Sequence, residues 1–273
     1  MHRRQWRDRL YGWLGWLELI FGVFAAISAG LLRMPVQTAH SSWPFAGRAL
    51  ELLRGQEWWV VPLAIIVAGL CHSGRRYLGP PWMWNAIHRL ISAFRDEVFK
   101  TVQNSTEDHH RVTLFRYKKR RFWFCKWPWS GWLIAVARSG HQTQAKRPAF
   151  RAHDQSDHTQ GVAGRAWGRS EWVFVPKKSE PQLPDVLANP DDMSRMMEYA
   201  KRTIVTVEWL KHEIDKGKHP ARSFAAFRVI VNDEPWGVIV IDSREPDGIL
   251  QMSRLNGKFS PYGKAITPLL ERV

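Results

Sequence analysis

The feature that most constrains this chain is an apolar run near its N-terminus, from Tyr11 to Leu32, interrupted by one charge, Glu18. Because a helix rises about 1.5 Å per residue, these 22 residues can cross a hydrocarbon core about 30 Å thick, and they are too many for an ordinary core helix. A cleaved secretory signal is the alternative, but the run is about twice the usual length of a signal's apolar region. We therefore expect a transmembrane helix over residues 11–32.

A second apolar run, Trp58 to Gly74, contains no charge. With 17 residues it is at the lower limit for crossing a bilayer, so a tilted or re-entrant segment is the alternative to a full span. We expect the two runs to form a two-helix membrane hairpin within residues 1–78, with spans at about 11–32 and 58–74.

Basic residues near the two runs predict the orientation of this hairpin, because Lys and Arg gather on the cytoplasmic side of membrane spans. Arginines outside the hairpin are Arg3, Arg4, Arg7, Arg9, Arg75, Arg76, Arg89 and Arg95, whereas Arg33, Arg48 and Arg54 lie between the runs. We therefore expect an inner (plasma) membrane protein with both termini and the C-terminal domain in the cytoplasm.

Small residues recur along one face of the first run, at Gly22, Ala26 and Gly30. Such a face lets another helix approach closely and predicts a homo-oligomer, although small residues are also common in membrane spans generally. Glu18 lies about two turns inside the run, where a carboxylate needs a partner or water. It either reaches back to the basic head or serves a pore or an inter-subunit contact.

The net charge of +15 and the pI of about 10.3 suit an anionic partner. With a membrane anchor in the chain, the lipid bilayer is the expected partner and nucleic acid is not. A basic run from Lys118 to Arg121, followed by FWFCKWPW, is typical of membrane surfaces and of single-strand nucleic-acid binders, but a basic turn between strands has the same composition. Two cysteines exclude a disulfide framework and fit a reducing compartment.

Periodicity beyond the hairpin predicts a linker helix within residues 79–104 and then an α+β domain over 105–273, with one antiparallel sheet and flanking helices. The expected strands are 109–117, 122–127, 132–140, 172–175, 227–231 and 238–241; the expected helices are 161–167, 191–216 and 267–273; residues 141–160 are expected to be a polar loop.

Two stretches of this domain, GVAGRAWGRSEWVFVP (161–176) and RVIVNDEPWGVIVIDSREPDGI (228–249), resemble the two most recognisable segments of GAF domains. The resemblance implies a sheet of five or six strands with helices on one face and a ligand cavity on the other. It also implies a small ligand, such as a cyclic nucleotide, a tetrapyrrole or a metabolite, or simply dimerisation. The chain lacks the N-K-F-D-E series of phosphodiesterase sites and a cysteine for bilin attachment, so no bilin is expected.

Candidate ligand-binding residues gather in and near the polar loop. Arg147 and Arg151 could clamp a phosphate with His153 beside them, while Trp132 and Phe150 could line a cavity. The alternative is a solvated loop without a ligand. The set His153, Asp154, Asp157 and His158 has metal-binding residue types but a nonspecific spacing, so no metal is expected.

These features predict a sensor rather than an enzyme, because no nucleophile motif or phosphate loop is present. We expect a membrane-anchored cytoplasmic ligand sensor whose GAF-like domain controls oligomerisation or packing of the hairpin. This arrangement is similar to two-span effectors of bacterial anti-phage signalling, which detect a nucleotide second messenger and damage the membrane. The alternative is a scaffold that senses nothing and dimerises or recruits a signalling partner.

Overall fold

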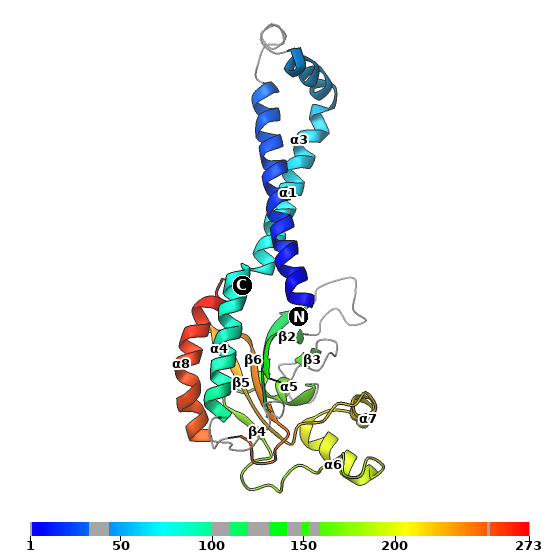
Figure 1. Cartoon of the computed structure of the whole chain (residues 1–273), viewed down its shortest axis with the longest axis vertical. Coiled ribbons are helices and arrows are strands. Elements are labelled where there is room, and N and C mark those ends of the chain that lie inside the picture. Colours follow the sequence, from blue (N-terminus) through cyan, green and yellow to red (C-terminus); the bar gives the residue numbers. More distant parts are fainter. Residues whose placement is uncertain are drawn as a thin grey trace. The chain divides into compact units, whose positions relative to one another are not determined.

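The computed structural model of the chain describes residues 2–32, 44–99, 110–119, 131–140, 149–152, 159–249 and 252–272. The chain divides into a helical unit, Met1–Trp84, and a second compact unit, Asn85–Arg272, which we call the sheet domain. Figure 1 shows the elements of both.

The helical unit pairs two long helices, α1 (His2–Leu32) and α3 (Pro44–Leu78). They run antiparallel, since the earlier Tyr11 contacts Arg75 and the later Glu18 contacts His72. They also pack closely: a Cβ on Gly15 would lie 3.4 Å from Arg75 Cζ, and a Cβ on Gly74 would lie 3.2 Å from Leu14 Cδ1. Large apolar side chains on the outside of both helices are exposed, among them Leu19, Ile20, Val23, Phe24, Ile65, Ile66 and Leu70.

One stretch among the described residues, Asp8–Ala29 within α1, is long and apolar enough to cross a membrane. The second expected span, residues 58–74, is not long and apolar enough to meet the same criterion. It lies inside the 35-residue helix α3, which contains Pro62 and also takes in the preceding charged segment. The two-span hairpin therefore stays a prediction.

In the described residues, the sheet domain contains six antiparallel strands in the order β3-β2-β1-β6-β5-β4. Their bounds are β1 His110–Lys119, β2 Gly131–Gly140, β3 Ala149–Ala152, β4 Val173–Val175, β5 Ser223–Val231 and β6 Glu234–Ser243. The turn between β5 and β6 consists of Asn232 and Asp233, both at positive φ (51° and 60°), as a tight two-residue hairpin requires. The expected α+β class and antiparallel sheet are confirmed.

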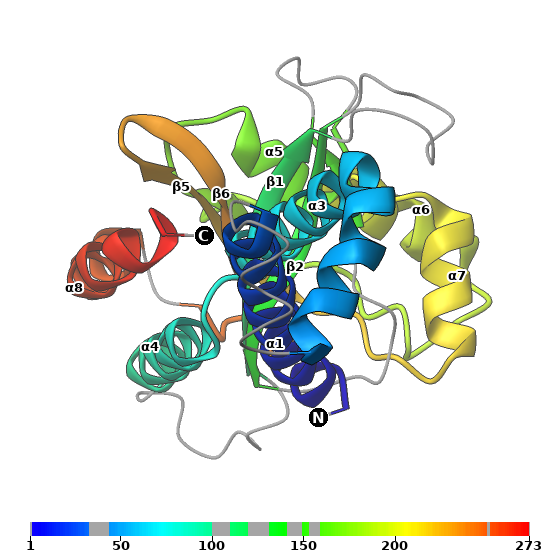
Figure 2. The same ribbon diagram turned by 90° about the horizontal axis from the view of Figure 1, so that it is seen from above.

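Helices lie on both faces of this sheet (Figures 1 and 2). On one face are α4 (Pro81–Phe99) and α8 (Met252–Leu270), where the Phe259 ring lies 5.3 Å from that of Phe94 and 5.7 Å from that of Phe227. On the other face are α5 (Gly161–Trp167), α6 (Met193–Thr203) and α7 (Val207–Asp215). Their apolar side chains join Phe115, Leu133 and Val238 in a second core.

Three expected elements differ from the observed ones. The polar loop 141–160 contains β3, an edge strand too short to be recognised by alternation. The single helix 191–216 is two helices, because Ile204 adopts a left-handed conformation (φ 57°) that ends α6. The closing helix begins far earlier than Thr267, whose hydroxyl bonds to Gly263 O (2.9 Å) inside α8 instead of capping it. The expected strand 122–127 lies outside the described residues.

Candidate ligand-binding site

A cavity of about 170 Å³ lies on the α5 face of the sheet. Its wall comes from β1, β2, β3, β5 and β6, and its cover comes from α5, α6, α7 and the segment that follows α7. The lining residues are Arg111, Thr113, Phe115, Arg138, Phe150, Gly161, Val162, Ala163, Tyr199, Thr203, Val205, Trp209, Leu210, Glu213, Lys218, His219, Pro220, Ala221, Phe224, Val240, Asp242 and Arg244.

Strand register builds the polar wall of the cavity. Side chains two apart on a strand share a face, so β1 presents Arg111 and Thr113 together. Arg111 is directly opposite Asp242 on β6, and its Nε donates to Asp242 Oδ2 (2.9 Å). Thr113 is directly opposite Arg138 on β2, whose Nε donates to Thr113 Oγ1 (3.2 Å).

Positive charge exceeds negative charge in this lining, with four Lys or Arg side chains against two carboxylates. Lys218 pairs with Glu213, and Arg111 pairs with Asp242. Among the described residues, Arg138 and Arg244 pair with no carboxylate. The cavity is therefore electropositive.

Arg138 is the most perturbed of these cations. The pKa of its guanidinium is lowered to about 10, first by burial and second by the nearby Arg111 charge, while Asp242 opposes both effects. The side chain is still charged at neutral pH. A partly buried cation whose described hydrogen-bond partner is one hydroxyl would be stabilised by an anion.

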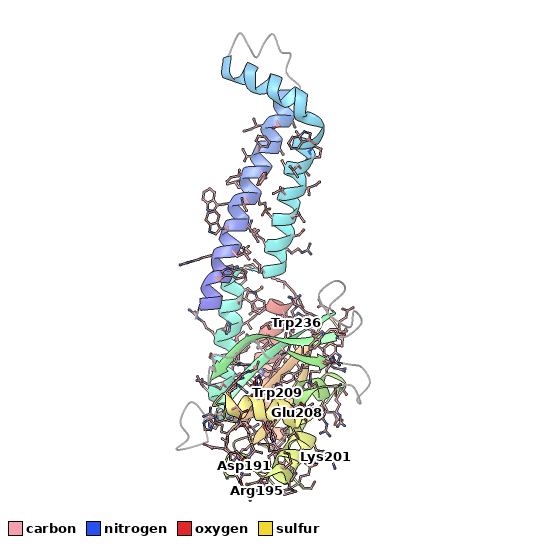
Figure 3. The ribbon with its side chains drawn as sticks, turned by 90° about the vertical axis from the view of Figure 1, so that its right-hand side faces the viewer. Asp191, Arg195, Lys201, Glu208, Trp209 and Trp236 are labelled. Carbon is pink, nitrogen blue, oxygen red and sulfur yellow. The ribbon has the colours of Figure 1, made fainter. Side chains whose placement is uncertain are left out.

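The rest of the lining is mainly apolar, and one glycine shapes its edge. α5 begins at Gly161, where φ is +72° and a Cβ would lie 2.8 Å from Phe150 Cδ1, so only glycine lets the helix start against that ring. Tyr199 donates its hydroxyl to Ala221 O (2.7 Å), and burial raises the pKa of this phenol, so it stays neutral. Trp209, which is labelled in Figure 3, belongs to α7. It lines the cavity and is 39% exposed.

Of the five ligand-binding residues expected from the sequence, Phe150 lines this cavity. Arg151 follows it on β3 and therefore lies on the opposite face of the sheet. There it pairs with Trp132, and its Cζ lies 5.6 Å from the indole centre. Arg147 and His153 lie outside the described residues. No group of three or more His, Cys, Asp or Glu side chains is placed to hold a metal in the part of the chain that the structure describes.

The polar lining of Arg111, Arg138 and Asp242 escaped the sequence reasoning, although a signal for it was present. In RVTLF, arginine alternates onto the same face as Thr113 and Phe115. A strand whose two faces are both covered by helices places such an arginine in the interior. The packing of helices on both faces of β1 is decided by the tertiary structure and cannot be read from the sequence of the strand.

The expected membrane and oligomer residues have separate surroundings in α1. Glu18 accepts from Arg75 Nη1 (2.8 Å) and lies 2.9 Å from His72 Nδ1, so its carboxylate is held within the helix pair. A Cβ on Gly22 would meet nothing within 4 Å, and Ala26 is exposed, so neither is used in packing against α3. Gly30 belongs to α1, but its surroundings lie outside the described residues.

No protein-family model and no curated protein matches the chain. Similar solved structures include a type II free methionine-R-sulfoxide reductase from Thermoplasma acidophilum (14% identity, 69% of this chain, 94% of that chain, TM-score 0.37). Others are a GAF domain region from Geobacter sulfurreducens PCA (16%, 69%, 97%, 0.36) and the GAF domain of an Acinetobacter phosphoenolpyruvate-protein phosphotransferase (10%, 68%, 91%, 0.36). TM-scores this low identify neither a ligand nor an activity.

Proposed function

We propose that this chain is a membrane-anchored sensor whose sheet domain binds a small anionic ligand in the cavity on its α5 face. The observation that carries the proposal is Arg138, a partly buried arginine that faces the cavity and pairs with no carboxylate in the described residues. A carboxylate or phosphate at that point would supply the missing counter-charge and accept several guanidinium hydrogen bonds. The GAF resemblance of residues 161–176 and 228–249 supports a ligand at this place in the fold.

The shape of the cavity restricts the ligand further. Phe115, Phe150, Leu210 and Phe224 line it beside the charged wall, which suits a molecule with one anionic group and an apolar body. Its volume of about 170 Å³ is close to that of a cavity of ~150 Å³ known to hold benzene. A cyclic nucleotide is much larger than benzene, so a small metabolite is the preferred class.

We also propose that the helical unit anchors the sensor and carries its output. Exposed apolar side chains surround both α1 and α3, as lipid contact requires. The face of Gly22 and Ala26 is open to a second copy of the chain, which supports an oligomer. Glu18 is held by Arg75, which favours a clamp within the helix pair over a pore-lining role. The cytoplasmic orientation and membrane damage in anti-phage defence remain predictions without structural support.

No catalytic role is proposed. The described lining contains neither cysteine nor serine, and the described cysteine, Cys71, lies in α3 of the helical unit. The Arg and Lys side chains that line the cavity are suited to binding an anionic group.

Thermal unfolding of the detergent-purified full chain tests the sensor. A panel of small carboxylates, amino acids, phosphorylated metabolites and cyclic nucleotides should contain at least one ligand that raises the midpoint by several degrees at about 100 times its Kd. Arg138→Met should abolish that rise. Lys201→Met removes the same charge from the exposed surface of α6 and should leave it intact. If no compound shifts the wild-type midpoint, the scaffold alternative replaces the sensor.

A further inference from the structure

The helical unit carries a charged cluster between its two helices, formed by Glu18 of α1 with His72 and Arg75 of α3. Glu18 Oε2 accepts from Arg75 Nη1 (2.8 Å), and Glu18 Oε1 lies 2.9 Å from His72 Nδ1. Arg75 also donates from Nη2 to the hydroxyl of Tyr11 (3.3 Å). These contacts fix the register of the antiparallel pair, because they place Glu18 level with His72.

This register aligns two charge-free segments, Leu19–Leu32 in α1 and Trp58–Cys71 in α3, which we together call the apolar band. Each segment has 14 residues and contains no Asp, Glu, Lys or Arg. The charged cluster adjoins both segments at one end. At the other end, the sequence continues with Arg33 after the first segment and begins with Glu57 before the second. Charge therefore limits the apolar band at both of its ends.

The apolar band has a packed inner side and an open outer side. The two helices lie side by side (Figures 1 and 3), and Ser28 of α1 and Ala64 of α3 are buried. On the outer side, large apolar side chains of both segments are exposed, namely Leu19, Ile20, Val23, Phe24, Ile27, Leu63, Ile65, Ile66 and Leu70.

Exposed tryptophans lie near each end of the apolar band. Trp13 and Trp16 lie beyond the charged cluster, and Trp59 lies at the start of the α3 segment. Indole rings are favoured at the level of the lipid headgroups. The two sets of tryptophans therefore mark the two interfaces between which the apolar band would lie.

The apolar band is shorter than an ordinary bilayer is thick. Its 14 residues extend about 21 Å at about 1.5 Å per residue, whereas a typical hydrocarbon core is about 30 Å thick. The whole apolar run of α1, Tyr11–Leu32, would cover such a core only if the charged cluster entered the hydrocarbon. Charged groups are costly there, whereas a bilayer changes its thickness at a modest cost per ångström.

We propose that the helical unit fits a bilayer with a hydrocarbon core about 21 Å thick, and that it compresses a thicker bilayer around itself. This inference rests on the proposed anchoring of the helical unit, and it names the lipid partner that suits the anchor, one with short acyl chains. Two copies in a thick bilayer would share the compressed region, so the mismatch also favours the oligomer that the open face of Gly22 allows.

A competition between thin and thick vesicles tests this fit. The detergent-purified full chain is diluted into an equal mixture of dimyristoleoyl-phosphatidylcholine vesicles, which carry a biotinylated lipid, and dierucoyl-phosphatidylcholine vesicles, which do not. The two lipids share a headgroup, and the acyl chains of the first are much shorter. After capture on streptavidin, we expect roughly threefold more chain on the thin vesicles than on the thick ones, and the same ratio when the biotin is exchanged.

A matched pair of triple variants separates the length of the apolar band from the ion pairs. Glu18→Leu with His72→Leu and Arg75→Leu lengthens the charge-free segment of α3 to 18 residues, about 27 Å, and should bring the ratio to about one. Glu18→Gln with His72→Gln and Arg75→Gln removes the same ion pairs but keeps polar groups at that level, and should leave the ratio near three. Circular dichroism verifies that both variants keep their helices.

Equal capture of the wild-type chain by thin and thick vesicles would overturn the inference, and so would equal ratios for the two triple variants. A helix pair that lies within one leaflet predicts the first of these results. Anchoring is scored separately, by flotation with dioleoyl-phosphatidylcholine vesicles. A chain that does not float loses the anchor of the proposed function, whereas a chain that floats without preference keeps the anchor and loses only the fit to a thin bilayer.

Discussion

Arg138 reaches the cavity wall from β2 with one described partner, the hydroxyl of Thr113. Arg111, one strand away, has the carboxylate of Asp242, which is only 7% exposed. Substitution of Arg138 and substitution of Arg111 therefore have different effects on the charge balance of the cavity. Removing Arg138 removes a partly buried charge that has no ion-pair partner among the described residues, whereas removing Arg111 leaves the buried Asp242 carboxylate without its partner.

We predict that Arg138→Met raises the free energy of unfolding of the unliganded chain by about 1 kcal/mol, while Arg111→Met lowers it by about 3 kcal/mol. Denaturant titration monitored by circular dichroism measures both. If the two substitutions destabilise the chain equally, Arg138 is a structural residue of the sheet and the ligand proposal loses its main support.

At the scale of elements, the turn between β5 and β6 shows what sequence reasoning could and could not locate. The expected strands 227–231 and 238–241 leave six residues between them, but the turn consists of Asn232 and Asp233 alone, so that β6 begins at Glu234. Asp233 has φ of 60°, a conformation that costs a residue with a Cβ free energy and costs glycine almost none. Its side chain is exposed and contributes no core packing.

Asp233→Gly should therefore stabilise the sheet domain by about 0.5–1 kcal/mol. Asp233→Ala, which lacks a side chain suited to this conformation, should destabilise it by a similar amount. Hydrogen exchange of the β5 and β6 amides would localise both effects. A destabilising glycine would mean that the Asp233 carboxylate stabilises the turn by a contact not accounted for here.

The other differences between the expected and the observed elements have local causes. α6 and α7 share an amphipathic pattern, and the break between them lies at Ile204, a β-branched residue in a conformation that such residues seldom adopt. Thr206, which caps α7 by accepting from Trp209 N (3.2 Å), was a readable start signal. β3 has four residues, and alternation over so short a segment is not distinctive.

For the whole molecule, the question is how the helical unit associates. Gly15 and Gly74 make close contacts between α1 and α3, whereas Gly22 lies where an added side chain meets nothing within 4 Å. A substitution at Gly22 can thus disturb assembly without disturbing the helix pair itself. A substitution at Gly15 cannot.

Gly22→Leu should shift the reconstituted chain from oligomer toward monomer in chemical cross-linking, with an unchanged thermal midpoint. Gly15→Leu should instead lower the midpoint, because its side chain would displace Arg75 from Glu18. If Gly22→Leu leaves the oligomer unchanged, the face of α1 that contains Gly22 takes no part in assembly.

The local chemistry of the sequence determined the long apolar helix, the amphipathic helix α4, the glycine-started helix α5 and most strands, because each depends on a periodicity or a turn signal within a few residues. Only the tertiary structure decided the site. Arg111 and Asp242 are 131 residues apart, and they meet because β1 pairs with β6 in one register, which brings the polar positions of both strands to the same face. Strand partners and register are set by packing of the whole sheet, and no short window of sequence contains them.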